Sequence, residues 1–188
     1  FLFFIMTTTL FAEASILDDG INYYNQRSNI QTNLIADKGN ISKAISIFET
    51  QLNTKNDKKA AIYLIKSYYF MAQYVSLNDD DKIFYFDLAM TLCKQYMYKY
   101  SESVEILYWY LATMSNWAKT VGVMAITKMG GGEEFREKAV DVIMLDPEYE
   151  NGGGFFLLGA VYHTAPYIPL ISSWPDNKKS IKSSASAA

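Results

Sequence analysis

The stretch from Leu145 to Tyr162, LDPEYENGGGFFLLGAVY, decides the fold. Its first part, Leu145-Asp146-Pro147, ends one helical pattern, because proline lacks the amide hydrogen that a helix interior needs. After a glycine-rich turn, Phe155 opens a second pattern, in which large apolar residues recur at helical spacing up to Tyr162. Two helices joined by a short turn form a helical hairpin, so this stretch predicts an all-α protein.

The spacing of the second pattern is that of a known repeat. Phe155, Leu158, Gly159 and Tyr162 resemble the aromatic-x2-Leu-Gly-x2-Tyr signature of the first helix of a tetratricopeptide repeat (TPR), with Phe where Trp is usual. Comparable units begin about 40 to 50 residues apart, against about 34 in the standard repeat, near residues 16, 57, 102 and 152. The resemblance implies an α-α superhelix of irregular TPR-like helical hairpins, formed by a single domain over residues 15–188.

Apolar residues at helical spacing predict most of the other helices. A first helix over about 16–36 is expected to end at Asp37-Lys38-Gly39, since glycine suits the position after a helix, and Asn40 is expected to cap the second. The third helix has an apolar seam with steps of three and four: Ala61, Leu64, Tyr68, Met71 and Val75. Asn78 to Asp81 predict the start of a fourth.

Two further helices are expected before the deciding stretch. The fifth, over about 102–129, is apolar nearly all round and should be the most buried. After Gly130 to Gly132, a sixth helix is expected to bury Phe135, Ala139 and Val142.

Composition excludes several classes of function. The chain has 188 residues, half of them hydrophobic and 20% charged, which is ordinary for a globular protein. Its net charge of −3 provides no basic surface of the kind that nucleic-acid binding requires. One cysteine, Cys93, excludes an intrachain disulfide and a cysteine-based metal site, and one histidine, His163, excludes most histidine-based sites. We therefore expect no enzyme, no cofactor, no metal site and no nucleic-acid partner.

The first residues indicate a compartment. An apolar run from Phe1 to Phe11, followed by Ala12-Glu13-Ala14, is typical of the end of a secretory signal peptide. The run is shorter than the roughly 20 apolar residues that span a bilayer. The sequence therefore predicts a signal-peptide remnant at 1–14 and an exported, periplasmic protein, soluble or peripheral. An ordinary buried first helix is the alternative.

The second half of the chain resembles a transporter family. The quoted stretch, together with Tyr108-Trp109-Tyr110, Asn116-Trp117-Ala118 and Pro166, is similar to the T component of tripartite periplasmic TRAP transporters. Ser172 to Pro175 depart from the pattern of that family. The resemblance implies a non-catalytic, all-helical periplasmic protein that meets a solute-binding protein or a small apolar ligand.

Five residues are candidates for binding. In the register of a TPR helix, His163 follows the signature tyrosine and faces the concave groove, and Phe156 shares that face. Trp109, Asn116 and Trp117 lie on the fifth helix, where a buried amide needs a partner that a ligand could supply. The alternative interpretation is core packing for the fifth helix and a helix-end contact for His163.

Other patterns are weaker. Asp79 to Asp81 lack the spaced ligands of a calcium loop, and the glycine runs lack the Gly-Lys-Ser/Thr ending of a phosphate loop. Asp146, Glu148 and Glu150 leave open a carboxylate-dependent hydrolase on a helical scaffold as the alternative function, although catalysis needs two carboxyl groups held in unequal environments.

Overall fold

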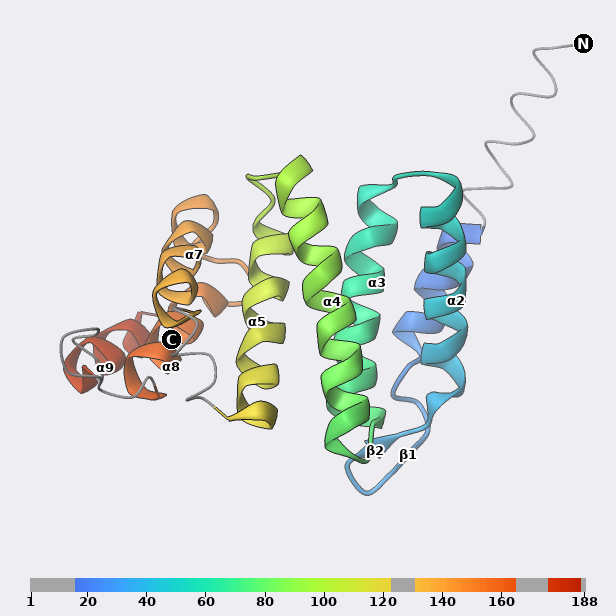
Figure 1. Ribbon diagram of the computed structural model, residues 1–188, viewed down its shortest axis with the longest axis horizontal. Coiled ribbons are helices and arrows are strands. Elements are labelled where there is room, and N and C mark those ends of the chain that lie inside the picture. Colours follow the sequence, from blue (N-terminus) through green and yellow to red (C-terminus); the bar gives the residue numbers. More distant parts are fainter. Residues whose placement is uncertain (1–15, 123–130, 165–175, 187–188) are drawn as a thin grey trace, which may run out of the picture. The chain divides into compact units, whose positions relative to one another are not determined.

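The computed structural model describes residues 16–122, 131–164 and 176–186, and most of them are helical (Figure 1). The predicted all-α fold is confirmed. The chain divides into two compact units, unit 1 up to Leu92 and unit 2 from Cys93, and the division falls within one helix. The predicted signal-peptide remnant at 1–14 lies outside the described residues, and the single domain over 15–188 stays a prediction.

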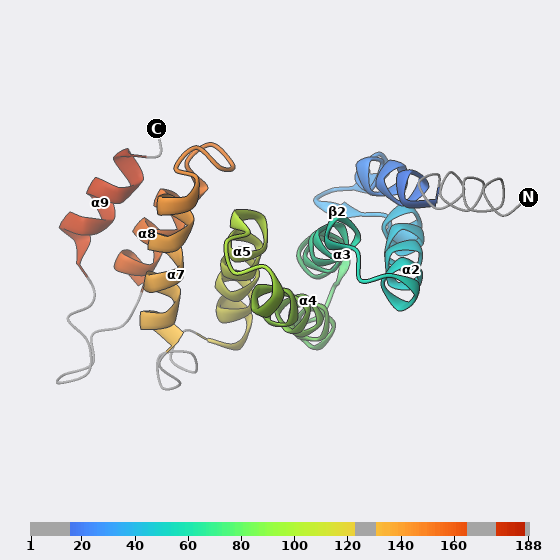
Figure 2. The same cartoon turned by 90° about the horizontal axis from the view of Figure 1, so that it is seen from above.

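Unit 1 begins with a helix over residues 16–25 and a short antiparallel hairpin. The elements after the hairpin are helices, and the third of them, η1 (Met71–Val75), is a π-helix. In chain order the elements are β1 (Gln31–Thr32), β2 (Ile35–Ala36), α2 (Lys38–Thr54), α3 (Lys58–Phe70), η1 and the first part of α4 (Asp79–Lys99). Figures 1 and 2 show α2 and α3 side by side and antiparallel, so the two helices form a helical hairpin.

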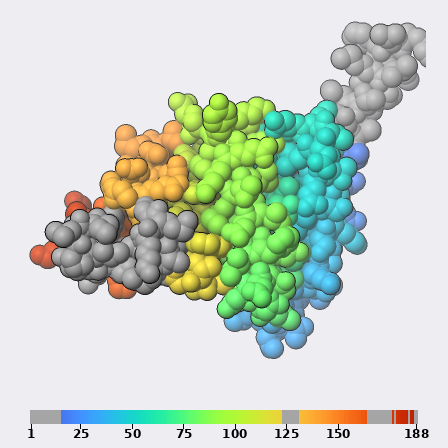
Figure 3. All heavy atoms as spheres, viewed as in Figure 1, coloured from blue at the N-terminus to red at the C-terminus, as the bar shows by residue number. Residues whose placement is uncertain are grey.

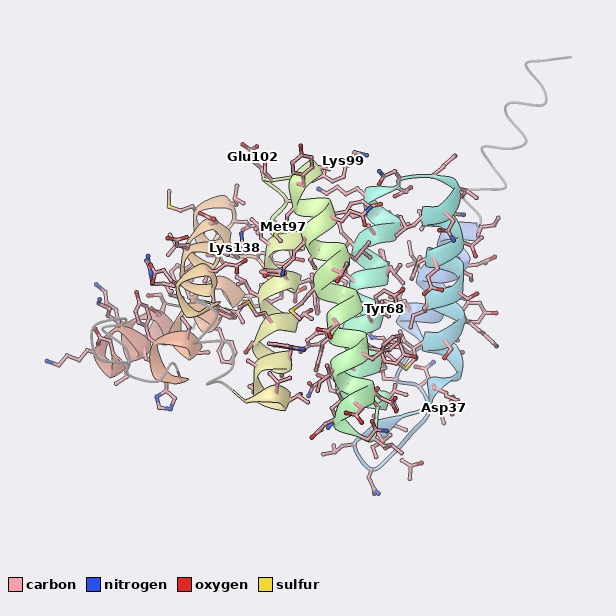
Figure 4. All side chains as sticks on the ribbon, viewed as in Figure 1. Asp37, Tyr68, Met97, Lys99, Glu102 and Lys138 are labelled. Atoms are coloured by element: carbon pink, nitrogen blue, oxygen red, sulfur yellow. The ribbon has the colours of Figure 1, made fainter. Side chains whose placement is uncertain are left out.

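Aromatic side chains fill the core of unit 1. Phe48 on α2 is completely buried and stacks on Tyr63 of α3, with the ring centroids 5.6 Å apart. Tyr63 also meets Tyr24 of the first helix edge-on, at 5.3 Å. Tyr68, labelled in Figure 4, lies in the predicted seam of α3 and donates a hydrogen bond from its hydroxyl to Glu49 Oε1 at 2.6 Å. The seam is confirmed: its first four residues are buried and Val75 packs against the core.

The segment after the first helix differs from the prediction. Residues 26–36 form turns and the β1–β2 hairpin instead of continuing the helix. Asn33 closes the hairpin with a φ of 56°, a left-handed value that asparagine tolerates better than most residues. Asp37 starts α2 rather than ending a helix, because its side chain accepts a hydrogen bond from the backbone amide of Gly39.

In the part of unit 2 that the structure describes, the end of α4 is followed by further helices. They are α5 (Val104–Val121), α7 (Gly131–Leu145), α8 (Gly153–Thr164) and α9 (Asn177–Ala185). The predicted seam of α7 is confirmed, since Phe135, Ala139 and Val142 are all buried. Tyr110 on α5 donates from its hydroxyl to Glu134 Oε1 on α7 at 3.0 Å, and α8 packs between α7 and α9.

Helix α5 is shorter and less buried than predicted. It ends at Val121, because Gly122 takes a φ of 97° that no helix accommodates. Its buried residues lie in its first two thirds, up to Met114, and those from Ser115 to Val121 are half-buried or exposed. The apolar residues on all sides of α5 therefore predicted more burial than the helix has along its whole length. Within the described parts of the chain, α5 and the other helices all lack either the length or the apolarity needed to cross a bilayer.

Candidate functional site

The turn before α8 fixes where that helix begins. Helix α7 ends at Leu145, and Asp146 accepts a hydrogen bond from the amide of Glu148 at 3.0 Å. Glu150, Asn151 and Gly152 then take left-handed φ values of 50°, 56° and 77°. Three such residues in succession reverse the chain, so that α8 returns along α7.

Two glycines set α8 directly against its neighbours. A Cβ atom at Gly153 would lie 2.5 Å from Cε2 of Tyr108 on α5, and one at Gly154 would lie 2.9 Å from Cγ1 of Ile143 on α7. Both distances are shorter than van der Waals contact, so only glycine permits this approach. On the other side, Ser180 of α9 donates from its hydroxyl to the carbonyl of Gly159 at 2.9 Å. Helix α8 is therefore held from three directions.

The remaining face of α8 is open. Leu157 and Val161 are buried, whereas Phe156 is 63% exposed and His163 is exposed. Phe156 and His163 are seven residues apart, which is close to two helical turns, so they lie on the same face. We call these two side chains the α8 face. The structure thus brings together two of the five predicted binding residues.

The other three predicted residues lie on α5. Trp109 is half-buried, and its ring meets Tyr108 edge-on at a centroid distance of 5.6 Å. Asn116 is half-buried, and its side-chain amide donates to the carbonyl of Ala112, one turn earlier, at 3.0 Å. The sequence led us to expect that the Asn116 amide needs a hydrogen-bond partner from outside its helix. Its own helix supplies part of that need. Trp117 is half-buried, and its indole nitrogen is buried without a hydrogen-bond partner among the described residues.

Two tyrosines that the sequence did not single out complete the surroundings of Trp109. Tyr108 meets Tyr149, in the turn before α8, edge-on at 5.3 Å. Burial raises the pKa of Tyr149 above its ordinary value, and a hydrogen bond from Trp109 opposes that rise. Burial, followed by the nearby charge of Glu150, also raises the pKa of Tyr108. Both tyrosines occur in the family resemblance, but their spacing of 41 residues gives no local signal of contact.

The carboxyl groups of the turn make local contacts. Asp146 is occupied by the amide of Glu148, and neither it nor Glu150 faces a second carboxyl group in the contacts of the turn. No three His, Cys, Asp or Glu side chains are grouped to hold a metal ion in the parts that the structure describes. An exposed aromatic ring and an exposed imidazole on one face of a helix that is fixed by backbone contacts are typical of a binding surface.

The chain matches no model of a known protein family, and a comparison with curated proteins also gives no match.

Proposed function

We propose that this protein is a non-catalytic binding protein whose α8 face contacts a partner. The observation that carries the proposal is the combination of a fixed backbone and an open face on α8. Gly153, Gly154 and the Ser180 hydrogen bond hold the helix, while Phe156 stays 63% exposed. A rigid aromatic side chain loses little conformational entropy on binding, which is why such residues dominate interface energies.

The wider proposal is an exported, periplasmic protein built from TPR-like hairpins. The motif around Phe155 and the apolar run at 1–14 support it. The resemblance to the T component of TRAP transporters favours a periplasmic solute-binding protein as the partner, and a small apolar ligand is the alternative. His163 would then donate or accept a hydrogen bond at the edge of the contact.

Site-specific photo-crosslinking tests the proposal. A benzoylphenylalanine at position 156 is expected to capture a partner in the periplasm, whereas one at position 98 is not. Tyr98 is a matched control because it is 96% exposed and belongs to the same unit. Equal capture at the two positions would mean that exposure alone, and not the α8 face, explains the result.

The captured partner then allows a quantitative measurement. With both proteins purified, Phe156→Ala should weaken binding about tenfold, which corresponds to about 1.4 kcal/mol. Tyr98→Ala should leave the affinity unchanged. Native mass spectrometry of the protein from its own periplasm separates the two partner classes, since a small apolar ligand would appear as an added mass without any second protein.

A further inference from the structure

A group of exposed apolar side chains lies at one end of unit 1. The hairpin and the residues after α3 contribute five large side chains that are between 44% and 90% exposed. We call them the hairpin patch: Ile30, Leu34, Ile35, Tyr74 and Leu77. Large apolar side chains exposed together, rather than singly, mark an interaction surface.

Contacts between β2 and η1 join the hairpin to the segment after α3, and the other members of the hairpin patch are close neighbours of these two elements in sequence. In β2, Ala36 points into the core, so its neighbour Ile35 points outward. Strand β2 packs against η1, which carries Tyr74. The ring of Tyr74 lies 5.0 Å from that of Phe70, at the end of α3. Figure 3 shows this end of unit 1, with the hairpin in light blue and the start of α4 in green.

The backbone beneath the hairpin patch is fixed. The amide of Asp37 donates to the carbonyl of Ile30 at 2.8 Å, and the side chain of Asn40 donates to the carbonyl of Gln26 at 3.0 Å. The guanidinium of Arg27 lies 4.0 Å above the ring of Tyr24 and donates to its carbonyl. The exposed side chains are thus presented by an ordered loop, which lowers the entropy cost of binding.

Acidic side chains border the hairpin patch. Asp37, labelled in Figure 4, follows β2, and Asp79 to Asp81 begin α4 two residues after Leu77. Asp79 pairs with Lys82 at 3.1 Å, while Asp80 makes no ion pair with any residue that the structure describes. Counting Lys38, Lys82 and Arg27, which lies beneath the patch, against the four aspartates leaves a net charge of −1.

We propose that the hairpin patch docks a partner segment that is both apolar and basic, such as an amphipathic helix with lysine or arginine on its polar face. The apolar side chains would bury the apolar face, and the aspartates would attract the basic residues. A second copy of this chain would bring the same acids together, and an anionic membrane would meet repulsion. This surface belongs to unit 1 and does not depend on the α8 face.

A pair of synthetic peptides tests the proposal on the full chain. The first is a fluorescein-labelled peptide of leucine and lysine, about 14 residues long, which gives about four helical turns. The second has glutamate in place of lysine. Fluorescence anisotropy should show saturable binding of the lysine peptide at least about tenfold tighter than the glutamate peptide. Raising the salt from about 0.05 M to 0.5 M should reduce that difference.

Two variants and a control locate the binding. Leu34→Ser with Leu77→Ser should weaken lysine-peptide binding about tenfold. Asp79→Asn with Asp80→Asn and Asp81→Asn should remove most of the preference for lysine over glutamate. Tyr98→Ser changes an equally exposed apolar side chain in unit 2 and should have no effect. Unaltered circular dichroism shows that each variant is folded.

Other outcomes would overturn the proposal. Equal affinity for the two peptides, or binding that neither the Leu34→Ser, Leu77→Ser variant nor the aspartate variant changes, means that charge and the hairpin patch do not select the partner. If the protein sediments with neutral phosphatidylcholine vesicles and Leu34→Ser abolishes this sedimentation, the hairpin patch binds a lipid surface instead. If light scattering shows a dimer and the same substitution dissociates it, the occupant of the patch is a second copy of the chain.

Discussion

The two units differ in what brings their helices together. In unit 1, side chains pack on side chains: Phe48 stacks on Tyr63, and Tyr63 meets Tyr24. In unit 2, rings also meet rings, but the close approach of α8 puts a side chain directly on backbone: Tyr108 of α5 fills the space that a side chain at Gly153 would need. Between helices, the described part of unit 1 has such a contact where the ring of Phe48 lies against Gly20.

This difference predicts which substitutions each unit tolerates. A core of interlocked rings is damaged mainly by removing volume, because the cavity that remains cannot collapse. A close helix approach is damaged mainly by adding volume, because no free space exists at the contact. All three tryptophans, Trp109, Trp117 and Trp174, belong to unit 2, so tryptophan emission follows that unit while circular dichroism follows both.

The largest effect is expected from removing a ring in unit 1. Phe48→Ala should lower the free energy of unfolding by about 3–5 kcal/mol, because Phe48 is completely buried. Urea unfolding followed by circular dichroism measures the change. Phe156→Ala, which removes an equal volume from an exposed site, should cost less than about 0.5 kcal/mol. Similar costs for the two variants would mean that the ring core does not determine the stability of unit 1.

The next effect is expected from adding one methyl group in unit 2. Gly153→Ala should cost about 1–3 kcal/mol, since the new Cβ would lie 2.5 Å from the Tyr108 ring. The midpoint of urea unfolding, followed by the tryptophan emission maximum, should fall. Gly132→Ala is the control: it lies in α7 with nothing within 4 Å of its Cβ position, and it should stabilise by about 0.5–1 kcal/mol. Stabilisation by both variants would contradict the close approach.

Alkaline pH should affect unit 2 more than unit 1. Burial raises the pKa of Tyr108, Tyr110 and Tyr149 in unit 2 and of Tyr68 in unit 1 above the ordinary value of 10.0. Above pH about 10 the folded chain therefore keeps protons that the unfolded chain releases. The contribution of these tyrosines to the free energy of unfolding is complete below pH about 10 and is lost as the pH rises beyond it. The urea midpoint from the tryptophan emission maximum should fall between pH 9 and pH 11.

Circular dichroism provides the comparison for the pH series. The midpoint measured by that signal should fall less, because it includes unit 1. Tyr110→Phe should reduce the pH dependence of the tryptophan midpoint. A midpoint that does not change up to pH 11 would show that the buried tyrosines ionise equally in the folded and unfolded chain.

The smallest effect is expected from a pair of helix caps. Asp57 accepts hydrogen bonds from the amides of Lys59 and Ala60 at the start of α3, so Asp57→Ala should cost about 1 kcal/mol. Ser103 occupies the same position before α5, but its hydroxyl makes no capping hydrogen bond. Ser103→Ala should therefore change the urea midpoint little. A larger loss at Ser103 than at Asp57 would reverse this assignment of the caps.

Periodic patterns predicted the helices well, and short signals predicted their ends less well. The seam containing Leu64 and Tyr68 is confirmed because many residues contribute to one period. The stop at Pro147 is confirmed, since α7 ends at Leu145. The hairpin was missed because Ile30 and Leu34 have a helical spacing of four, although Asn33 sits between them in a left-handed conformation. Asp37 and Gly39 each fit a helix start or a helix end, and only tertiary packing decides between them.

The candidate site was only partly accessible to sequence analysis. The register of one helix placed Phe156 and His163 on a common face, because the period of a helix fixes that relation. The cluster of Tyr108, Trp109 and Tyr149 depends on a chain reversal and a close approach at Gly153. Such contacts join residues that are far apart in sequence, and no local sequence pattern predicts them.

The π-helix η1 determines where this part of the chain can gain or lose a residue. The amide of Ser76 donates to the carbonyl of Met71, five residues earlier, at 2.9 Å, so this turn contains one residue more than an α-helical turn. Losing one residue there would shorten the end of the helix and leave the register of Ala61, Leu64 and Tyr68 on α3 unchanged. An equal deletion in the middle of α3 would rotate every later side chain by about 100°. Insertions and deletions in related chains should therefore be tolerated at η1 and absent from α3.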